Sequence, residues 1–236
     1  MALPFFYFED IDIAASLITL NEETSKHVVQ VLRMKAGESL NITDGKGNLV
    51  TAVITEAHKK HCVVKKTAAS FQPQAERRIS IAISLVKNPG RFEWFLEKAT
   101  ELGVNEMIPL ICERTERQHF RYERMKGILV SAMLQSQQVW LPQLHEPIPF
   151  EQLMKLKLDN PVKLIAHCEE SEKQQLSNLQ INKSSNSIIL IGPEGDFTAT
   201  EIELALQHEY SPVALGETRL RTETAGVAAA VLLCVR

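Results

Sequence analysis

An almost unbroken apolar run from Ile79 to Val86 constrains the fold more than any other feature of this sequence. A strand that is apolar on both faces must be covered on both sides, which is typical of parallel sheets flanked by helices. The residues from Arg91 to Leu102 have helical spacing and end at Gly103. Further strands are expected at Val104–Cys112, Val162–Ala166, Ser187–Ile191 and Pro212–Leu215, and further helices at Tyr122–Gln138, Thr200–His208 and Thr222–Leu233. This alternation predicts an α/β fold with a mostly parallel sheet, whose ligands bind beyond the carboxyl ends of the strands.

Short β-rich segments occupy most of residues 1–70. The string Asp44-Gly45-Lys46-Gly47 indicates a hairpin, because glycine adopts positive φ without steric cost. Asn21 can cap one helix, and that helix would place His27, Val28, Val31 and Leu32 on one face. We expect a small barrel-like β domain at 1–70, a polar linker at 71–76 and the α/β domain at 77–236. The expected strands of the first domain are Phe5–Phe8, Ser39–Thr43, Leu49–Thr55 and His61–Thr67.

Charge and cysteine content narrow the classes of protein. The formal net charge is −3, so a nucleic acid would have to bind to a local basic patch. The four cysteines form no CxxC pair, which gives no support to a zinc or dithiol site and predicts buried, reduced thiols. The N-terminus lacks the basic start of a signal peptide, and the longest apolar run, Val227–Val235, is about half of what spans a bilayer. We therefore expect a cytoplasmic protein without a metal or a membrane partner.

Residues 188–198 lead from an apolar strand through a turn into a helix. Gly192 and Gly195 let the backbone approach a ligand closely, and Pro193 stiffens the turn between them. Thr198 or Thr200 can cap the helix that follows. A purely structural turn would also need two glycines, but the position at the end of a buried strand favours a ligand-binding loop.

Residues 215–226 again lead from a short strand into an apolar helix. Thr222 can cap this helix, and Glu223 suits the positive end of its dipole. Capping does not explain Arg219 and Arg221, because the dipole disfavours cations at this end. These two arginines are therefore candidates for meeting an anionic partner or intermediate. Neither this segment nor the previous one matches a Rossmann or Walker phosphate loop.

The segment from Glu113 to Lys126 is rich in arginine. Arg114, Arg117, Arg121 and Arg124 recur at steps of three and four, which on a helix would form a basic stripe. Aromatic residues lie among them, and mixed basic and aromatic surfaces suit single-stranded RNA. A solvated helix face with Glu113 and Arg117 as an ion pair explains the same pattern equally well.

These segments together resemble the RsmE family, the 16S ribosomal RNA uracil-N3 methyltransferases of the SPOUT class, over nearly the whole chain. The matching strings are His27-Val28-Val29-Gln30-Val31-Leu32-Arg33 with Gly37, Asp44-Gly45-Lys46-Gly47, Arg91-Phe92-Glu93, Glu97-Lys98-Ala99-Thr100-Glu101-Leu102-Gly103-Val104, Gly192-Pro193-Glu194-Gly195-Asp196-Phe197 and Leu220-Arg221-Thr222-Glu223-Thr224-Ala225. Two places depart from the family. The chain begins Leu3-Pro4-Phe5-Phe6 where the family has an arginine, and it reads Leu134-Gln135-Ser136-Gln137-Gln138 where the family has Glu-Gln-Ser-x-Arg.

The resemblance implies an N-terminal PUA-like β-barrel, a C-terminal domain with a deep trefoil knot, and a homodimer. It also implies S-adenosylmethionine as the methyl donor and 16S ribosomal RNA of the small ribosomal subunit as the substrate. The cofactor-binding residues that it implies are Ala166, His167, Gly192, Pro193, Glu194, Gly195, Leu215, Gly216, Leu220, Thr222 and Thr224. The expected RNA contacts are Arg33, Arg114, Arg117, Arg121 and Arg219.

Methylation at N3 of uracil requires loss of a proton, because the protonated nitrogen is a poor nucleophile. A cation near the base oxygens favours the deprotonated form. We hypothesise that Arg221 supplies this cation and that Glu223 acts as the base or orients a neighbour. Two alternatives remain open: an enzyme of the same class that acts on a ribose 2′-hydroxyl or on transfer RNA, and a non-catalytic RNA-binding assembly factor.

Overall fold

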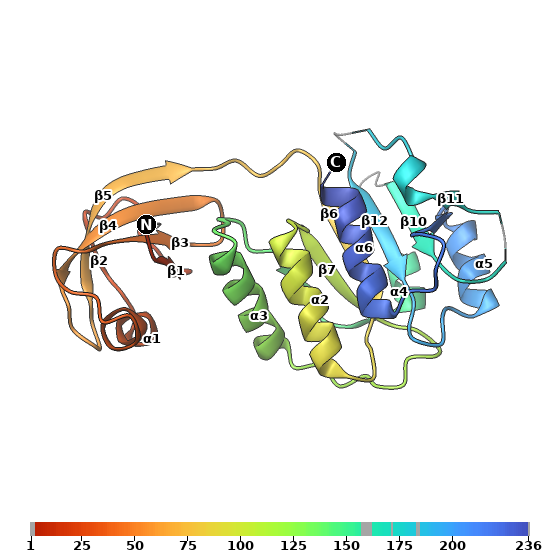
Figure 1. Cartoon of the computed structure of the whole chain (residues 1–236), viewed down its shortest axis with the longest axis horizontal. Coiled ribbons are helices and arrows are strands. Elements are labelled where there is room, and N and C mark those ends of the chain that lie inside the picture. The colour runs from red at the N-terminus through yellow and green to blue at the C-terminus, as the bar shows by residue number, and fades with distance from the viewer. Residues whose placement is uncertain (1–2, 157–161, 171, 183–184, 236) are drawn as a thin grey trace. The chain divides into compact units, whose positions relative to one another are not determined.

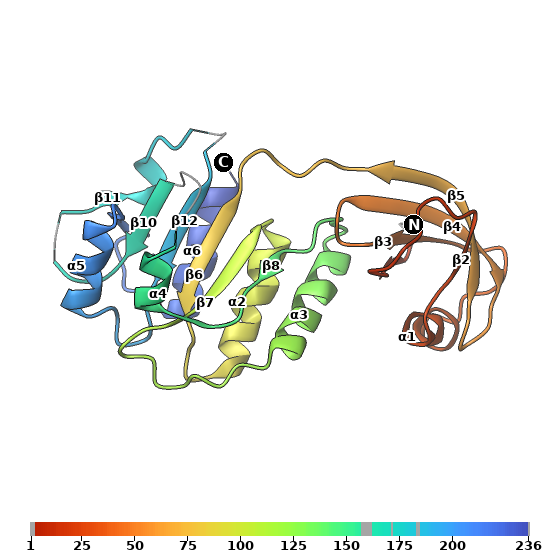
Figure 2. The ribbon, with the colours of Figure 1, turned by 180° about the vertical axis from the view of Figure 1, so that it is seen from behind.

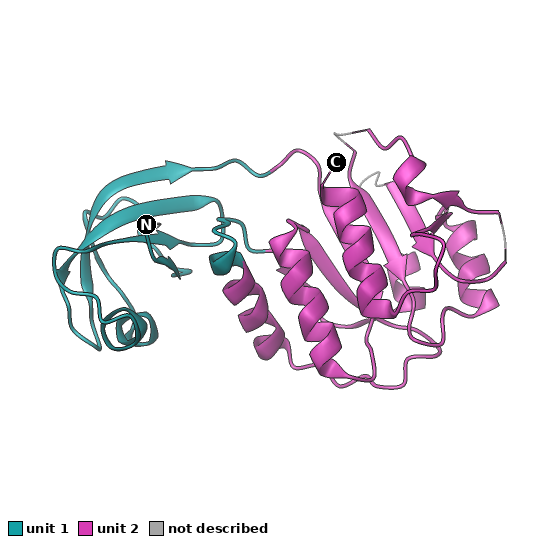
Figure 3. Cartoon of the chain, in the orientation of Figure 1, with its two compact units in different colours: residues 1–74, 133–141 teal, residues 75–132, 142–236 magenta. Residues whose placement is uncertain are grey.

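The computed structural model describes residues 3–156, 162–170, 172–182 and 185–235. The chain forms two compact units (Figure 3). Unit 1 comprises Met1–Gln74 with Met133–Leu141, and unit 2 comprises Ala75–Ala132 with Pro142–Arg236. A short piece from the middle of the chain thus belongs with the N-terminal unit.

Unit 1 is built on a five-stranded sheet in the order β1-β3-β4-β5-β2 (Figure 1). Only β1 and β3 run parallel, and the other pairs are antiparallel. The strands are β1 (Phe5–Tyr7), β2 (Leu17–Thr19), β3 (Ser39–Thr43), β4 (Asn48–Glu56) and β5 (Val63–Phe71). The sequence pattern missed β2, because three residues with only Ile18 buried are too short to show alternation.

The turn between β3 and β4 forms as the glycines predicted. Gly45 and Gly47 have φ values of 71° and 96°. The Asp44 carboxylate accepts hydrogen bonds from the backbone N–H of Lys46 at 2.7 Å and from the side-chain amide of Asn48 at 2.6 Å. A short polar side chain therefore holds the hairpin together from inside.

The helical segment of unit 1 differs from the expected amphipathic helix. Asn21 caps α1 (Glu22–Lys26), but the chain then widens into a π-helical turn, η1 (His27–Val31), closed by the bond from Leu32 N–H to His27 C=O. The wider turn rotates later side chains away from the core. Val28 is fully buried, whereas Val31 and Leu32 remain 65% and 45% exposed, so the prediction of one shared apolar face is wrong.

The segment Met133–Leu141 is bonded to the hairpin of unit 1. The N–H of Gly47 donates to Val139 C=O, and the N–H of Leu141 donates to Gly45 C=O, both at 2.9 Å. The Trp140 ring fills the space above Gly47, where a Cβ atom would lie 2.6 Å from it. These contacts join residues more than ninety positions apart in sequence, which no local pattern shows.

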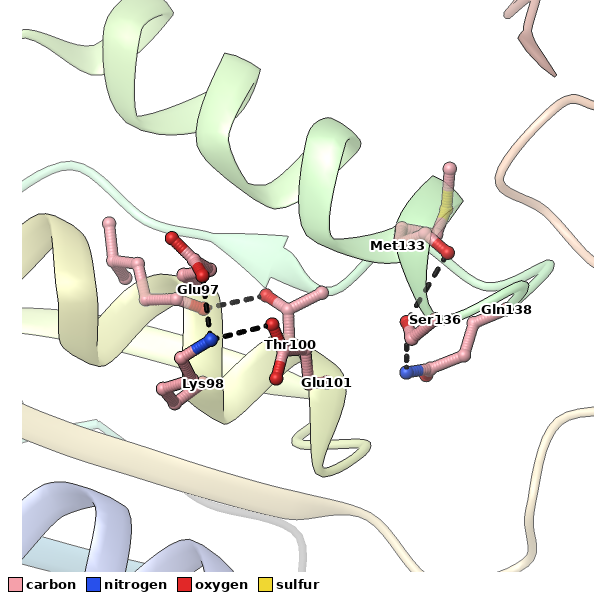
Figure 4. A network of polar contacts seen from close by, with 8 residues as sticks. Glu97, Lys98, Thr100, Glu101, Met133, Ser136 and Gln138 are labelled. Atoms are coloured by element: carbon pink, nitrogen blue, oxygen red, sulfur yellow. Dashed lines mark hydrogen bonds and ion pairs between the residues drawn. The ribbon is translucent and has the colours of Figure 1, made fainter. Parts of the chain in front are cut away.

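Two local polar networks lie in the helices of the two units (Figure 4). In unit 1, the amide of Gln138 donates to the Ser136 hydroxyl at 2.9 Å, and this hydroxyl donates to Met133 C=O at 3.3 Å. In unit 2, the Lys98 ammonium bridges Glu97 at 2.7 Å and Glu101 at 2.9 Å. Ser136 and Gln138 belong to the string that departs from the family pattern, and here they help to close the end of a helix.

Unit 2 has a sheet in the order β11-β13-β10-β12-β6-β7-β8, with β9 beside β7, and every pair is parallel. The mostly parallel sheet is therefore confirmed. All residues of the two central strands β6 and β12 are buried. The strands are β6 (Ile79–Ser84), β7 (Glu106–Ile111), β8 (Gln143–Leu144), β9 (Ile148–Pro149), β10 (Val162–Ala166), β11 (Gln174–Gln175), β12 (Ser187–Ile191) and β13 (Ser211–Ala214).

Helices cover both faces of this sheet. The helices α2 and α6 lie side by side on one face (Figure 1), and α4 and α5 lie on the other (Figure 2). The helical elements of unit 2 are α2 (Pro89–Glu101), α3 (Tyr122–Gln135, whose last turn groups with unit 1), α4 (Phe150–Met154), the 3-10 turn η2 (Leu176–Asn178), α5 (Ala199–Gln207) and α6 (Thr222–Cys234). No helix among the described residues is long and apolar enough to span a membrane.

Candidate functional site

Two adjoining cavities open at the carboxyl ends of β10, β12 and β13, each with a volume of about 280 Å³. Both are lined by residues of the chain after β10, of the loop before α6, and of α6 itself. The shared residues are Ala166, Cys168, Arg219, Leu220 and Ala225. This is where a parallel sheet is expected to bind ligands, and the two glycine-containing segments meet here as predicted from their positions after strands.

The turn after β12 forms one wall of the first cavity. Gly192 leaves room for Phe197, since a Cβ atom on Gly192 would lie 3.1 Å from both the Phe197 ring and its backbone nitrogen. Asp196 adopts the left-handed conformation with φ of 64°, which is uncommon for a residue other than glycine. Its carboxylate accepts from the N–H of Cys168 at 2.7 Å and from that of Phe197 at 2.8 Å. The turn is thereby bonded to the chain that follows β10.

A capping box starts α5 directly after this turn. The Thr198 hydroxyl accepts from Glu201 N–H, and the Glu201 carboxylate accepts from Thr198 N–H at 2.8 Å. Of the two threonines considered from the sequence, Thr198 is the cap. Glu201 also accepts from the N–H of Glu113 at 2.9 Å, so the start of α5 is fixed to the segment after β7.

The chain after β10 is held by a lysine. The Lys173 ammonium donates to the carbonyl oxygens of His167 at 2.9 Å and Glu169 at 2.5 Å. Burial, and then the charge of Lys173, lower the pKa of the His167 imidazole below its usual value, which favours a neutral ring. No described residue forms a hydrogen bond with His167 Nδ1. His167 thus lines the second cavity as an uncharged, polar side chain.

The loop from Leu215 to Leu220 lines the second cavity, and α6 begins after it. The N-cap of α6 is Arg221, whose side chain makes no capping bond, and Thr222 is the first helical residue. The prediction that Thr222 caps the helix is therefore wrong. Arg221, whose backbone is extended, and Thr222 instead line the first cavity.

Glu223 occupies a different environment from the arginines beside it. Its carboxylate is buried, and Oε1 lies 3.6 Å from Arg91 Nε of α2. No described residue forms a hydrogen bond with Oε2. Glu223 lines neither cavity, whereas Arg219 lines both and Arg221 lines the first.

Most of the cofactor-binding residues expected from the sequence lie together. The two cavities are lined by Ala166, His167, Gly192, Pro193, Glu194, Leu215, Gly216, Leu220 and Thr222 of that set. Gly195 and Thr224 do not line them. The sequence reasoning missed Cys168, Lys173, Asp196 and Ala225. Cys168 and Asp196 directly follow predicted residues and could have been included, but Lys173 carries no sequence signal.

The expected basic stripe does not form. The helix α3 begins only at Tyr122, so Arg114, Arg117 and Arg121 lie on an irregular segment and do not share a helix face with Arg124. Arg124 is engaged by Glu93 at 2.6 and 2.8 Å, and this hydrogen bonding lowers the pKa of the Glu93 carboxyl. The arginines recur every three or four residues in the sequence, but most of them do not lie on a helix. The prediction of a helical basic stripe is therefore wrong.

The other arginines expected to contact RNA are dispersed. Arg114 donates from Nη1 to Gly195 C=O at 2.7 Å, so its guanidinium is used within unit 2. Arg117 and Arg121 are exposed. Arg33 is exposed in unit 1 and adopts a left-handed conformation with φ of 55°.

Two protein families match successive parts of the chain. Residues 73–234 match the RNA methyltransferase domain family, and residues 20–67 match the RNA methyltransferase PUA domain family. A ribosomal RNA small subunit methyltransferase E from Rickettsia conorii is 30% identical over 219 residues, which cover 91% of this chain and 88% of that protein.

Two solved structures are similar over nearly the whole chain. A probable rRNA methyltransferase from Porphyromonas gingivalis superposes with a TM-score of 0.90 at 38% identity and covers 99% of both chains. A ribosomal RNA small subunit methyltransferase E from Neisseria gonorrhoeae, bound to S-adenosylmethionine, superposes with a TM-score of 0.88 at 27% identity, covering 98% of this chain and 96% of that one.

Proposed function

Because this chain belongs to the ribosomal RNA small subunit methyltransferase E family, we propose that it transfers a methyl group from S-adenosylmethionine to ribosomal RNA of the small subunit. The observation that carries this proposal is the pair of adjoining cavities beyond β10, β12 and β13. Their walls are the turn after β12 and the loop before α6, the two segments whose sequences are most typical of the family. A similar protein, the one from Neisseria gonorrhoeae, was crystallised with this methyl donor.

The chemistry of the cavity walls fits a compact, positively charged donor. Leu215, Leu220 and Ala225 provide apolar surface for a flat ring, and the glycine turns expose backbone groups to it. Two acidic residues, Glu194 and Asp196, also line the first cavity and offset there the positive charge of Arg219 and Arg221. The described residues contain no cluster that could hold a metal ion.

We further propose that the acceptor is N3 of a uridine. The donor supplies an electrophilic methyl group when bound. Arg221 lines the first cavity, where its guanidinium would stabilise the negative charge that remains on the uracil when its N3 proton leaves to solvent. Glu223 is buried beside Arg91 and lines neither cavity, so of the two roles considered for it we favour orientation of the start of α6. Arg219, which lines both cavities, would contact the RNA backbone, as would Arg33, Arg117 and Arg121.

The knot and the homodimer also belong to this proposal. The strand β13 lies on one side of β10, yet α6, which follows it, packs against β6 and β12 on the other side. Such a crossing supports a threaded chain. Trp94 on α2 and Val231 on α6 are 43% and 42% exposed, and these helices lie side by side. Their exposed apolar side chains support a second copy of the chain as the partner on this face.

The product identifies the reaction. Unmodified small ribosomal subunits and labelled S-adenosylmethionine should yield RNA that contains N3-methyluridine, detected by nucleoside mass spectrometry. A 2′-O-methyl ribose in this RNA, or label only in transfer RNA supplied to a parallel reaction, would assign the chain to another reaction of the same class. A calorimetric titration without any heat of S-adenosylmethionine binding would favour a non-catalytic assembly factor.

The Arg221→Ala variant separates chemistry from donor binding. We expect turnover to fall by about 10²- to 10³-fold, the usual effect of removing one group that stabilises a developing anion. The dissociation constant for S-adenosylmethionine should stay within about threefold of that of the parent protein, since the donor is held by backbone and apolar groups. The Arg221→Lys control keeps the charge and should retain more turnover. Loss of donor binding in Arg221→Ala would show that the residue shapes the cavity.

A further inference from the structure

We propose that Arg114 is a positioning residue for the methyl-donor site, and that it is not an RNA contact. The inference depends on the proposed function only in taking S-adenosylmethionine as the ligand of the two cavities. The Arg114 guanidinium donates from Nη1 to Gly195 C=O at 2.7 Å and to Phe197 C=O at 3.4 Å. One side chain therefore bonds two carbonyl groups of the turn after β12.

The turn needs such a support because its backbone is strained. Asp196, between the two bonded residues, has a φ of 64°, a conformation that costs energy in any residue with a side chain. Such a conformation persists where surrounding contacts hold it in place. The bond from Asp196 N–H to Pro193 C=O at 2.9 Å and the bonds of its carboxylate hold it from the cavity side. Arg114 holds it from the other side.

The position of Gly195 shows on which side Arg114 acts. Gly192, Pro193, Glu194 and Asp196 line the first cavity, but Gly195 does not. A Cβ atom on Gly195 would meet the Arg114 side chain, with its Cδ at 3.3 Å. The arginine thus lies behind the wall of the cavity, where it sets the shape of the turn without touching the ligand.

Arg114 lies on a segment that is held in place by hydrogen bonds of its two neighbouring residues. The next residue, Thr115, is buried, and its hydroxyl accepts from Cys112 N–H at 2.8 Å and bonds the Ser84 hydroxyl at 2.9 Å. On the preceding side, the N–H of Glu113 donates to Glu201 at the start of α5. Arg114 therefore fixes the turn after β12 relative to the carboxyl ends of β6 and β7.

A second bond joins the same elements. The Glu194 carboxylate accepts from Lys87 N–H at 3.0 Å, just after β6. The Lys87 ammonium in turn lies 2.8 Å from Glu116, two residues beyond Arg114. The turn is thus bonded to the segments after β6 and β7 at Glu194 and at Gly195, and removal of the arginine takes away the second of these two bonds.

Arg117 offers a matched comparison, because it lies three residues away on the same segment. It is exposed and forms no hydrogen bond or ion pair with the described residues. An RNA-contact role would apply to both arginines, whereas a positioning role applies to Arg114 alone. The experiment compares Arg114→Met with Arg117→Met in the full-length protein, by calorimetric titration of S-adenosylmethionine without RNA and by separate titration of small-subunit RNA without S-adenosylmethionine.

We expect Arg114→Met to weaken S-adenosylmethionine binding on the order of tenfold, as for the loss of one charge-assisted hydrogen bond. RNA affinity should stay at that of the parent protein. The Arg117→Met variant should bind the donor normally. Arg114→Lys can donate to one carbonyl group and should restore part of the affinity. Amide hydrogen exchange at Asp196 and Phe197 should quicken in Arg114→Met only, which reports the turn directly.

Two results would overturn the inference: unchanged donor affinity in Arg114→Met, or a loss of RNA affinity with donor affinity intact. If Arg114→Met does not fold, Arg114→Gln, which also removes the charged guanidinium, carries the test, with normal donor affinity as the contradicting result. Failure of the parent protein to bind S-adenosylmethionine would instead contradict the proposed function.

Discussion

Gly226 packs α6 closely against Phe95 and Ile83 of the core, and its replacement by alanine tests how tightly this part of the structure is packed. A Cβ atom there would lie 2.6 Å from Cε2 of Phe95 and 2.8 Å from Cδ1 of Ile83. Favourable contacts between carbon atoms begin at about 3.5 Å, so the helix would have to move by about 1 Å. Phe95 and Ile83 are fully buried, so neither can turn out into solvent to make room for the added methyl group.

The expected free-energy change combines two opposing terms. An added methyl group in a packed core costs about 1–3 kcal/mol, and alanine in place of glycine within a helix gains about 0.5–1 kcal/mol. We therefore expect Gly226→Ala to lower the free energy of unfolding by about 1–2 kcal/mol. The melting temperature should fall by roughly 2–4 °C for each kcal/mol lost.

Gly127 provides the control, since it lies inside α3 and an added Cβ atom would meet nothing within 4 Å. Gly127→Ala should raise the unfolding free energy by about 0.5–1 kcal/mol, because only the helix-propensity term applies. Thermal unfolding of both variants, followed by circular dichroism, measures the difference. If Gly226→Ala is as stable as Gly127→Ala, the steric reasoning is refuted. Because Thr222 and Ala225 line the cavity, Gly226→Ala should also bind S-adenosylmethionine more weakly.

The remaining predictions concern acid stability and the turn after β12. Hydrogen bonds from His145 and Ser80 hold the pKa of the Glu106 carboxyl below its usual 4.5, although burial acts in the opposite direction. The ionised Glu106 therefore stabilises the folded state fully above the unfolded pKa. This stabilisation is lost as the pH falls through the lower folded pKa. In urea unfolding between about pH 7 and pH 3, Glu106→Gln should be less stable than the parent at neutral pH and converge with it in acid; a constant difference would contradict this. Gly192→Ala should weaken S-adenosylmethionine binding, since buried Phe197 cannot move away from the added Cβ atom, and calorimetric affinity equal to that of the parent would count against the close packing of this turn.

Short sequence patterns predicted many of the strands and helices. The apolar run at Ile79–Val86 predicted the buried strand β6, and the spacing at Thr222–Leu233 predicted α6 to within one residue. Such patterns are informative because the spacing of apolar residues that is typical of a strand or a helix can be recognised within a few residues. The string from Gly192 to Phe197 was informative for the same reason, as the backbone conformation of a turn requires particular residues at particular positions.

Long-range contacts decided what the local pattern left open. The arginines of residues 114–124 have helical spacing, yet the chain is irregular as far as residue 121, where Thr115 bonds Ser84 and Glu113 bonds Glu201. The short strands β2, β8, β9 and β11 exist only because a neighbouring strand pairs with them. Likewise, nothing near Val139 in the sequence indicates that its carbonyl group bonds Gly47 of the N-terminal hairpin.

The candidate site also has features that the sequence determined and features that only the tertiary structure decided. The sequence alone determined that two glycine-containing loops follow strands, and parallel strands bring such loops to one edge of the sheet. Only the tertiary structure decided what each charged side chain does there: Arg114 supports a turn, Glu223 faces Arg91, and Lys173 holds the chain after β10. A long, flexible charged side chain can reach partners far away in sequence, so its role depends on which elements the fold places within its reach.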